Sequence, residues 1–499
     1  MDRLSNMCRL GLTALVVLMF AATLGISQEP RGKKGGGKGG SGLGGYEKPP
    51  PVNNVPTQPY NIILGRPTDT SITMRVLANS DGMGFVEYRA QGTEMAASTQ
   101  PVKLSAGTPH DITLDRLRKD QQYLSHWVWR PTGAADAVRS PQYRFHTQRA
   151  AGKPFTFTVQ ADSHLDENTS GEVYLRTLAN ALADEPDFHF ELGDTFMTGK
   201  YVRPELALGQ YLAQRYYLGH LCHSAPLFFV LGNHDGEVGG RGSIVWTSQT
   251  RKKYFPNPFP NDFYSGNQQH EPEIGVPEDY YAWEWGDAQF IVLDPFRYSA
   301  KPRRGGGNSE AESWYWTLGS EQYEWLKRVL VQSRAAYRFV FLHHLVGGAS
   351  QNQRGGAEVA SLWERGGKSA DGNYDFDRHR PGWGVPIHQL LKQHGVSIVF
   401  HGHDHLFAKQ DYGGIVYQEV PQPGHSRLGN TRTAEEYGYV SGEIQPSSGH
   451  VRVRVDHQGA RVDYVRAYLP SDESVNRRNG EATYSYQVRP NSTATGDKR

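Results

Sequence analysis

The sequence predicts a small all-β sandwich followed by a larger α/β domain, and three observations lead to this fold class. The first folded region has short strand-like runs, frequent turn residues and no long helical period. The second alternates near-continuous apolar runs with helical patterns, which is typical of strands buried on both faces of a sheet. The length of 499 residues allows two or three domains with buried cores.

The composition excludes several classes of protein. A formal net charge of +1 lacks the basic excess of a protein that coats nucleic acid. The chain has only two cysteines, which excludes a disulfide framework and a cysteine-built zinc or iron–sulfur site. It has 20 histidines, and their placement therefore decides the functional interpretation.

Residues 1–27 have the pattern of a secretory signal peptide. Arg3 and Arg9 precede an uncharged run, and small residues surround an expected cleavage site near Ser27. We expect export to a secreted or periplasmic location, with no stable membrane span after cleavage. The alternative is a retained N-terminal membrane anchor, for which the uncharged run is at the short edge of a bilayer-spanning length.

Residues 28–54 are expected to form a flexible linker. Nine glycines fall among residues 31–45, which show no apolar periodicity. Prolines 49–51 stiffen the end of this linker.

Residues 55–150 are expected to form the β-sandwich, with strand-like runs at 71–78, 84–90, 122–130 and 142–147. No catalytic cluster falls within it, so a role as scaffold or spacer is expected.

Residues 151–470 are expected to form the α/β domain. Its expected strands cover residues 155–161, 188–192, 227–231, 289–293, 338–342 and 396–400. Helical spacing around Leu178, Tyr211 and Leu326 predicts helices between them, and a short helix is expected between Pro386 and Gly395. Strand-like runs at 412–468 complete the domain, and the polar residues 471–499 are expected to form a frayed tail.

Polar side chains follow five of the predicted strands directly. The blocks are Asp162-Ser163-His164, Gly193-Asp194, Gly232-Asn233-His234-Asp235, His343-His344 and His401-Gly402-His403-Asp404-His405. Because ligands bind beyond the carboxyl ends of strands in open α/β sheets, we expect these side chains to meet in one place. The glycines permit sharp turns there.

This donor set suits two divalent metal ions. Carboxylate oxygen and imidazole nitrogen together favour first-row ions, with Mn, Fe or Zn expected. Two aspartates, one asparagine and four histidines are enough for two ions bridged by an aspartate, and one further histidine is then free to protonate a leaving group. Such a pair of ions clamps a phosphoryl group and activates a water molecule for attack.

In their order, the five blocks resemble those of the calcineurin-like metallophosphoesterase superfamily over residues 155–410. The resemblance implies two β-sheets packed as a sandwich, flanked by helices, with a dinuclear metal site at the edge. It also implies the site roles by position: Asp162, His164 and His405 bind one metal, Asn233, His343 and His403 bind the other, Asp194 bridges them, and His234 acts as general acid.

The preceding β-sandwich resembles the N-terminal fibronectin-like domain of purple acid phosphatases and related secreted phosphoesterases. The chain departs from that subgroup at Met197, which occupies the place of a metal-binding tyrosine. We therefore expect no purple tyrosinate–iron centre. The block around His343 and His344 also lacks a proline that relatives have, which leaves the choice between these two histidines open.

Other polar residues at the strand ends are expected to support the site. His401 is expected to support a ligand, and Asp235 and Asp404 either orient imidazoles or serve turns. Asp294 is expected to cap a turn. Residues 241–281, 296–316 and 347–383 form long irregular loops whose arginines and aromatic residues either bind substrate or fold over the core.

The expected function is that of an exported, metal-dependent phosphoesterase that uses a metal-bridging hydroxide on a phosphate-ester substrate, with monoesters slightly preferred. The first alternative is a phosphodiesterase or nucleotidase that acts on extracellular nucleotides. The second is a non-catalytic secreted binding protein that contains metal. A zinc peptidase is disfavoured because the sequence has no HExxH helix.

Overall fold

The computed structural model describes residues 45–240, 242–299, 313–345, 354–428 and 431–491. All of these residues belong to one compact unit that begins at Leu43. The predicted signal peptide, most of the predicted linker and parts of the last two predicted loops lie outside the described residues. No helix among the described residues is long and apolar enough to cross a membrane.

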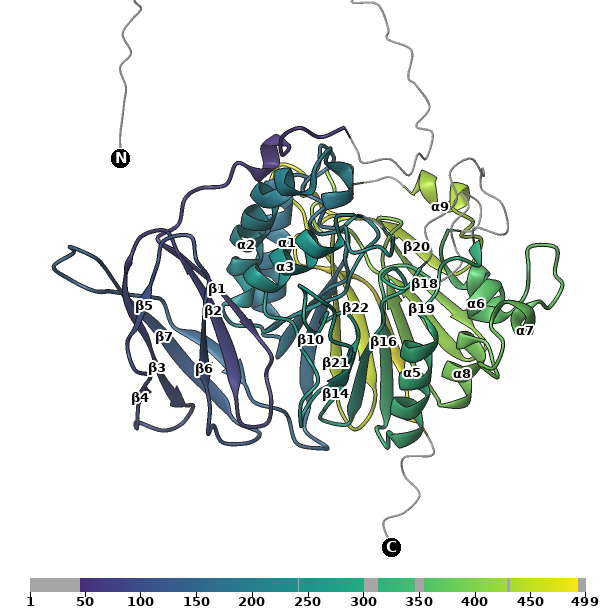
Figure 1. The fold of residues 1–499 in the computed structure, drawn as a ribbon, viewed down its shortest axis with the longest axis horizontal. Coiled ribbons are helices and arrows are strands. Elements are labelled where there is room, and N and C mark those ends of the chain that lie inside the picture. Colours follow the sequence, from purple (N-terminus) through teal and green to yellow (C-terminus); the bar gives the residue numbers. More distant parts are fainter. Residues whose placement is uncertain (1–44, 241, 300–312, 346–353, 429–430, 492–499) are drawn as a thin grey trace, which may run out of the picture. The chain divides into compact units, whose positions relative to one another are not determined.

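The first folded region is a two-sheet β-sandwich, as predicted, and it fits a fibronectin-like domain (Figure 1). One sheet has the order β1-β2-β6, and the other has the order β4-β3-β7-β8 with β5 beside β3 and β9 beside β7. Buried and half-buried residues alternate along β7, so Trp127 and Trp129 fill the core. The strands are β1 (Tyr60–Gly65), β2 (Ile72–Ala78), β3 (Gly82–Ala90), β4 (Ala97–Ser98), β5 (Val102–Leu104), β6 (His110–Leu114), β7 (Gln122–Pro131), β8 (Val138–Arg139) and β9 (Tyr143–His146).

The second region contains two larger sheets. The six-stranded sheet has the order β12-β11-β10-β21-β22-β23, and the eight-stranded sheet has the order β13-β14-β15-β16-β17-β19-β18-β20. Strands β10, β11 and β12 are parallel, as are β15, β16, β17 and β19. The strands are β10 (Phe155–Gln160), β11 (Phe188–Glu191), β12 (Leu227–Phe229), β13 (Ser265–Gly266), β14 (Tyr281–Trp285), β15 (Ala288–Val292), β16 (Tyr337–Phe341), β17 (Ile398–His401), β18 (Leu406–Tyr412), β19 (Ile415–Glu419), β20 (Glu443–Pro446), β21 (Gly449–Val455), β22 (Ala460–Arg466) and β23 (Ala482–Val488).

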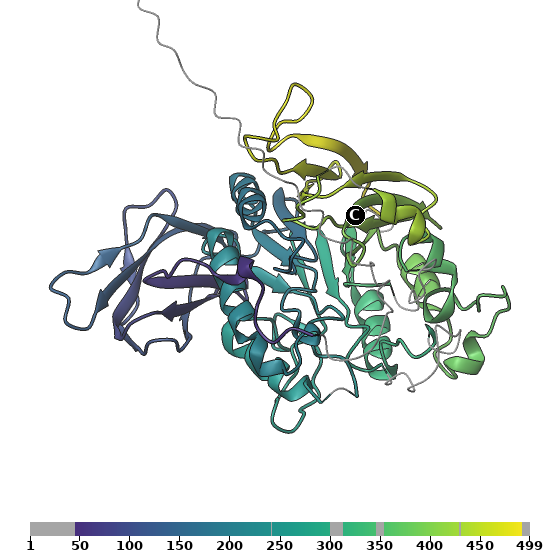
Figure 2. The same ribbon diagram turned by 90° about the horizontal axis from the view of Figure 1, so that it is seen from above.

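An aromatic core lies between these two sheets. Phe157 and Phe190 of the first sheet contact Phe290, Phe341 and Phe400 of the second. Helices cover the outer faces (Figures 1 and 2): α1 and α2 share a core with the first sheet, and α5 and α8 share one with the second. The fold is therefore a two-sheet α/β sandwich flanked by helices, as the resemblance implies.

The helices are short. The α-helices are α1 (Gly171–Ala183), α2 (Leu208–Cys222), α3 (Ile244–Tyr254), α5 (Ser320–Gln332), α6 (Trp363–Gly366), α7 (Phe376–His379), α8 (Ile387–Gln393) and α9 (Arg432–Glu436), and the 3-10 helices are η1 (Pro51–Asn53), η2 (Thr198–Lys200), η3 (Pro204–Ala207) and η4 (Ala357–Ser361). Ser170 caps α1 by accepting a hydrogen bond from the amide of Val173.

Three expectations are wrong in part. The tail predicted at 471–499 contains β23, which pairs with β22 because Tyr484 and Tyr486 pack on the aromatic core. The predicted loop 241–281 contains the helix α3. The described end of the predicted linker, from residue 45, is bound to the α/β domain, where the Tyr46 hydroxyl donates to Glu167 at 2.5 Å.

Candidate metal centre

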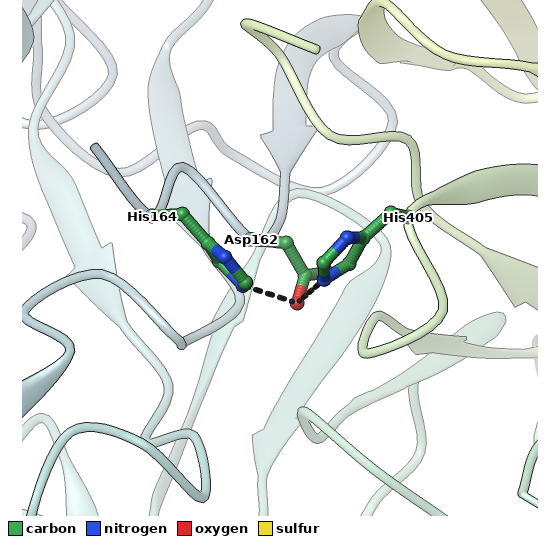
Figure 3. A group of neighbouring side chains, drawn as sticks. All are labelled: Asp162, His164 and His405. Carbon is green, nitrogen blue, oxygen red and sulfur yellow. Dashed lines mark ion pairs between the residues drawn. The ribbon is translucent and has the colours of Figure 1, made fainter. Parts of the chain in front are cut away.

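The polar blocks that follow β10, β11, β12, β16 and β17 meet at one edge of the two-sheet sandwich. Asp162, His164 and His405 form a first group, whose potential ligand atoms all lie within 4.8 Å of one another. His164 Nε2 and His405 Nε2 lie 3.6 and 3.5 Å from Asp162 Oδ1. Figure 3 shows both imidazoles directed at this carboxylate oxygen.

Asp194, His343 and His403 form a second group with the same 4.8 Å limit. His343 Nε2 lies 3.4 Å from Asp194 Oδ2 and 3.3 Å from His403 Nδ1. The two groups are adjacent, because His343 Nε2 lies 3.9 Å from Asp162 Oδ1 and His164 Nε2 lies 3.8 Å from Asp194 Oδ2.

Asn233 and His234 lie beside these groups. The side-chain oxygen of Asn233 is buried and has no hydrogen-bond partner. His234 donates its backbone N–H to Asp194 Oδ1 at 2.8 Å, and its Nε2 lies 3.9 Å from Asp194 Oδ2. The side chain of His234 is 29% exposed, so it borders the solvent side of the site.

The open choice between His343 and His344 has a geometric answer. His343 faces both aspartates, whereas the ring of His344 packs on His403 at 4.2 Å and its Nε2 contacts the carbonyl oxygen of Arg354. Of the two histidines, His343 is therefore the one with a ring nitrogen directed at the carboxylates.

The residues present fit metal ions, as their free polar atoms show. Asp162 uses Oδ2 to accept the backbone N–H of His403 at 2.8 Å, and its Oδ1 is buried without a hydrogen-bond partner. His164 Nε2 and Asn233 Oδ1 are also buried and unpartnered. Unpaired buried polar atoms are costly, and oxygen and nitrogen donors of this kind suit bound cations.

Hydrogen bonds on the far side of the imidazoles set which nitrogen is free. His343 Nδ1 donates to the carbonyl oxygen of Leu192 at 2.8 Å, and His164 Nδ1 donates to Asp166 Oδ2 at 3.1 Å. Each bond directs Nε2 towards the other candidate ligands, which is the arrangement usual around metal-bound histidine. Sequence reasoning missed Asp166, although a carboxylate two residues after His164 was a visible signal.

The charges in the site favour a cation. Burial alone would lower the pKa of His164, but the neighbouring carboxylates of Asp162 and Asp166 outweigh it and raise the pKa to about 10. Asp194 and Asp162 likewise overcome burial and raise the pKa of His343 to about 9. Burial opposes ionisation of both aspartates, yet the histidines hold the pKa of Asp162 and Asp194 below the usual range. The buried carboxylates therefore attract positive charge.

The backbone is strained at five of the candidate ligand positions. Asp162, His164, Asp194, His403 and His405 have φ angles of 58°, 47°, 52°, 91° and 58°. Such left-handed conformations cost about 1–3 kcal/mol each in residues other than glycine and persist only where the surroundings enforce them.

Close backbone approach explains the glycines of two blocks. A Cβ on Gly232 would lie 2.2 Å from the backbone nitrogen of Asp194, and one on Gly193 would lie 2.6 Å from the backbone nitrogen of Gly232. Asp235 holds these two turns together, since its carboxylate accepts backbone N–H groups from Gly232, Asp194, Thr195 and Phe196 at 2.8–3.0 Å. Asp235 thus serves turns and does not orient an imidazole.

Asp404 and His401 support the third turn. Asp404 accepts hydrogen bonds from Arg354 Nε and the Tyr439 hydroxyl, both at 2.9 Å. His401 Nδ1 lies 2.6 Å from Glu419, which in turn accepts the backbone N–H of Asp404 at 3.0 Å. His401 therefore contacts the third turn only by way of Glu419. Sequence reasoning missed Glu419 because this residue ends β19 without a recognisable motif.

Several basic and aromatic side chains of the predicted loops fold inwards, whereas Phe259 and Tyr374 are exposed. Arg251 and Arg297 are both buried and both pair with Glu237, with closest N–O distances of 2.6 and 3.1 Å. Trp314 is buried in the core beside α5. Asp294 accepts the backbone N–H groups of Phe296 and Arg297, which confirms its predicted role as a turn cap.

This fold, with aspartate, asparagine and histidine gathered at strand ends, defines a metal-dependent phosphoester hydrolase. The model of one family, described as calcineurin-like phosphoesterase, matches residues 155–407. The chain belongs to the calcineurin-like phosphoesterase family. No curated protein matches it.

Solved structures share the fold at low sequence identity. Purple acid phosphatase PPD1 from yellow lupin (Lupinus luteus) seeds has a TM-score of 0.56 and 16% identity, covering 86% of this chain and 74% of that chain. A structure of PhoD has a TM-score of 0.60 and 15% identity, covering 89% of this chain and 93% of that chain.

Proposed function

We propose that this protein is an exported phosphoesterase that holds two divalent metal ions, with Mn, Fe or Zn expected. Asp162, His164 and His405 would hold one ion, Asn233, His343 and His403 the other, and Asp194 would bridge them. The observation that carries this proposal is that the two groups are adjacent. Asp194 Oδ2 faces one histidine of each group, at 3.4 Å from His343 Nε2 and 3.8 Å from His164 Nε2.

The two ions, when bound, would polarise the phosphoryl oxygens and lower the pKa of a coordinated water molecule. His234 lies beside Asp194 at the half-exposed border of the site. We assign His234 the role of proton donor to the leaving oxygen. Burial lowers the pKa of His234 to about 3, although Asp194 opposes this. The negative charge of a bound phosphate ester raises that pKa and favours the protonated imidazole.

The absence of a tyrosine ligand separates the proposed centre from a tyrosinate–iron site. Met197 is buried at the corresponding place. The nearby hydroxyl of Tyr201 is bound to Gln210 at 3.0 Å, and that of Tyr211 contacts Thr198 at 3.1 Å. We therefore propose that the protein is not purple and holds no tyrosinate-bound ferric centre, and a tyrosinate charge-transfer band in the pure protein would contradict this.

We assign the sandwich to residues 55–150 and start the catalytic domain at 151, between β9 and β10. Because β23 pairs with β22, the catalytic domain extends to residue 488 and is not limited to 470.

Phosphate release from a panel of esters tests the proposed activity. Wild-type protein should release phosphate from an aryl phosphate monoester somewhat faster than it cleaves an aryl diester, and a chelator should abolish both reactions. Asp194→Ala should lower turnover by more than about 100-fold, because it removes a shared ligand. A faster diester or nucleotide reaction selects the phosphodiesterase or nucleotidase alternative, and metal binding without turnover on any ester selects the binding protein.

Intact-mass analysis of exported protein tests the localisation. The expected mature chain begins close to Gln28, and retention of residues 1–27 would instead indicate the membrane anchor.

A further inference from the structure

We infer that Gln210 and Gln214 of α2 are positioning residues of the metal centre, and that the N-terminal sandwich supports them through the same helix. This inference rests on the proposed function, because it concerns the same site. On this inference the sandwich helps to position the metal centre and is not only a spacer.

The two glutamines bind the turns that carry the proposed ligands. Gln210 Nε2 donates to the carbonyl oxygen of His164 and, at 3.1 Å, to that of Thr195. Gln214 Nε2 donates to the Ser163 hydroxyl at 2.9 Å and to the carbonyl oxygen of Thr195 at 3.0 Å. The helix thereby ties the turn after β10 to the turn after β11.

These hydrogen bonds hold segments in which the backbone has a strained, left-handed conformation. His164 and Asp194, with φ of 47° and 52°, lie in or next to the segments that the glutamines hold. Residues in such conformations relax unless neighbouring groups fix them. Buried Glu191 makes a second tie between the same turns, since it accepts from the Ser163 hydroxyl at 2.9 Å and the Thr195 hydroxyl at 3.2 Å.

The acceptor atoms of both glutamines are also occupied. Gln210 Oε1 accepts from Tyr201 at 3.0 Å, and Gln214 Oε1 accepts from Tyr174 at 3.3 Å. Both side chains are fully buried, and four residues apart they share one face of α2. A buried helix face is normally apolar, so two satisfied amides here are explained by the polar backbone that they hold in place.

Another face of α2 is bound by the sandwich. Asn61 of β1 donates its side-chain amide to the carbonyl oxygen of Arg215 at 2.7 Å. Arg215 Nη2 donates to the carbonyl oxygens of Asn61 and Arg75 at 3.2 and 3.1 Å. A Cβ on Gly219 would lie 2.1 Å from the amide nitrogen of Asn61, so the fit is close.

A continuous apolar core joins the two faces. Ile63 and Leu77 of the sandwich belong to the same buried cluster as Leu218 of α2. That cluster also contains Leu165 and Phe196, which follow His164 and Asp194 within one or two residues. Displacement of the sandwich would therefore be transmitted to both ligand turns.

Zinc affinity, measured by competition with a chromophoric chelator on the full chain, tests the inference. Gln210→Met and Gln214→Met keep the side-chain length and remove the amide. Each should weaken binding of at least one of the two zinc equivalents by tenfold or more. Gln322→Met is the matched control, since Gln322 of α5 is equally buried and donates to the carbonyl oxygens of Asp294 and Leu318 at 2.8 and 3.0 Å. It should lose similar thermal stability and keep its zinc affinity within twofold.

A sandwich variant extends the test and decides the matter if the glutamine variants fail to fold. Asn61→Ala should weaken zinc binding threefold or more, whereas Ser140→Ala, which removes a hydrogen bond from the backbone of Trp127 inside the sandwich, should not. Folded variants of Gln210, Gln214 and Asn61 that all bind zinc as the wild type does would overturn the inference. Wild-type protein that binds no metal would instead overturn the proposed function.

Discussion

His234 is the residue whose loss should affect turnover without affecting metal binding. Its imidazole borders the site at 29% exposure and belongs to neither ligand group. We expect His234→Ala to lower turnover by about 10²–10⁴-fold, the usual range for loss of a general acid, while the metal content stays unchanged. Steady-state kinetics together with metal analysis checks this, with the exposed His457→Ala as control. Loss of metal in His234→Ala would make His234 a ligand.

Asp166 fixes the ring of His164 by accepting its Nδ1–H at 3.1 Å. Asp166→Asn should weaken metal binding by about 10–100-fold, because partners of metal-bound histidines have effects of that size. A chelator titration measures the change, and Glu172→Gln removes an equal charge from an exposed position of α1 as the control. Equal affinity in Asp166→Asn and wild type would show that His164 needs no such orientation.

At the scale of elements, the aromatic layer between the sheets provides the main packing. Phe341 of β16 stacks on Phe190 of β11 with ring centroids 3.9 Å apart, and on Phe400 of β17 at 5.0 Å. Phe341→Ala should lower the free energy of unfolding by about 3–5 kcal/mol, which a urea titration of metal-free protein measures. Val331→Ala on the exposed side of α5 should cost no more than about 0.5 kcal/mol. A loss below about 1 kcal/mol in Phe341→Ala would contradict tight packing of the two sheets.

Elements with a local signal were the ones that could be predicted. The apolar runs gave β10, β11, β15, β16 and β17 to within two residues at each end, because strands buried on both faces are continuously hydrophobic. Strand β23 was missed because its exposed and half-buried residues alternate in a polar segment, and its place depends on pairing with β22. Helix α3 was missed because it has no apolar stripe, since Thr247, Ser248 and Arg251 line its buried side.

The candidate site divides in the same way. The aspartate, asparagine and histidine blocks were visible because each follows a strand directly. The groups that hold them were not, since Gln210, Gln214, Glu191 and Glu419 lie in helices or strands and reach the site only in three dimensions. Sequence patterns therefore predict the candidate ligands at strand ends. The residues that hold those ligands in place can be identified only from tertiary contacts.

At the scale of the whole molecule, a salt bridge inside the sandwich holds an arginine that also contacts the catalytic domain. Arg75 of β2 donates to both oxygens of Asp111 at 2.5 and 2.6 Å, and also to the carbonyl oxygen of Lys252 in α3. Burial would raise the pKa of Asp111, but Arg75 outweighs burial and holds it below the usual value. The bridge therefore contributes stability above the unfolded pKa of about 3.9, and this contribution is lost as pH falls through the lower folded pKa.

Asp111→Asn tests this pH dependence. The difference in free energy of unfolding between wild type and Asp111→Asn should be full at about pH 6 and should shrink as the pH falls below the unfolded pKa of about 3.9, as followed by urea titration at each pH. A difference that stays constant across this range would show that Asp111 stabilises the domain contact without its charge.

The central claim is that side chains from five strand ends together hold two metal ions. Native mass spectrometry of the purified full chain, titrated with zinc, tests it most directly. We predict that the wild type takes up two zinc ions per chain and that Asp194→Ala does not reach two at the same zinc concentration. A wild-type chain that binds no zinc, or that binds only one ion at saturation, would contradict the two-metal site.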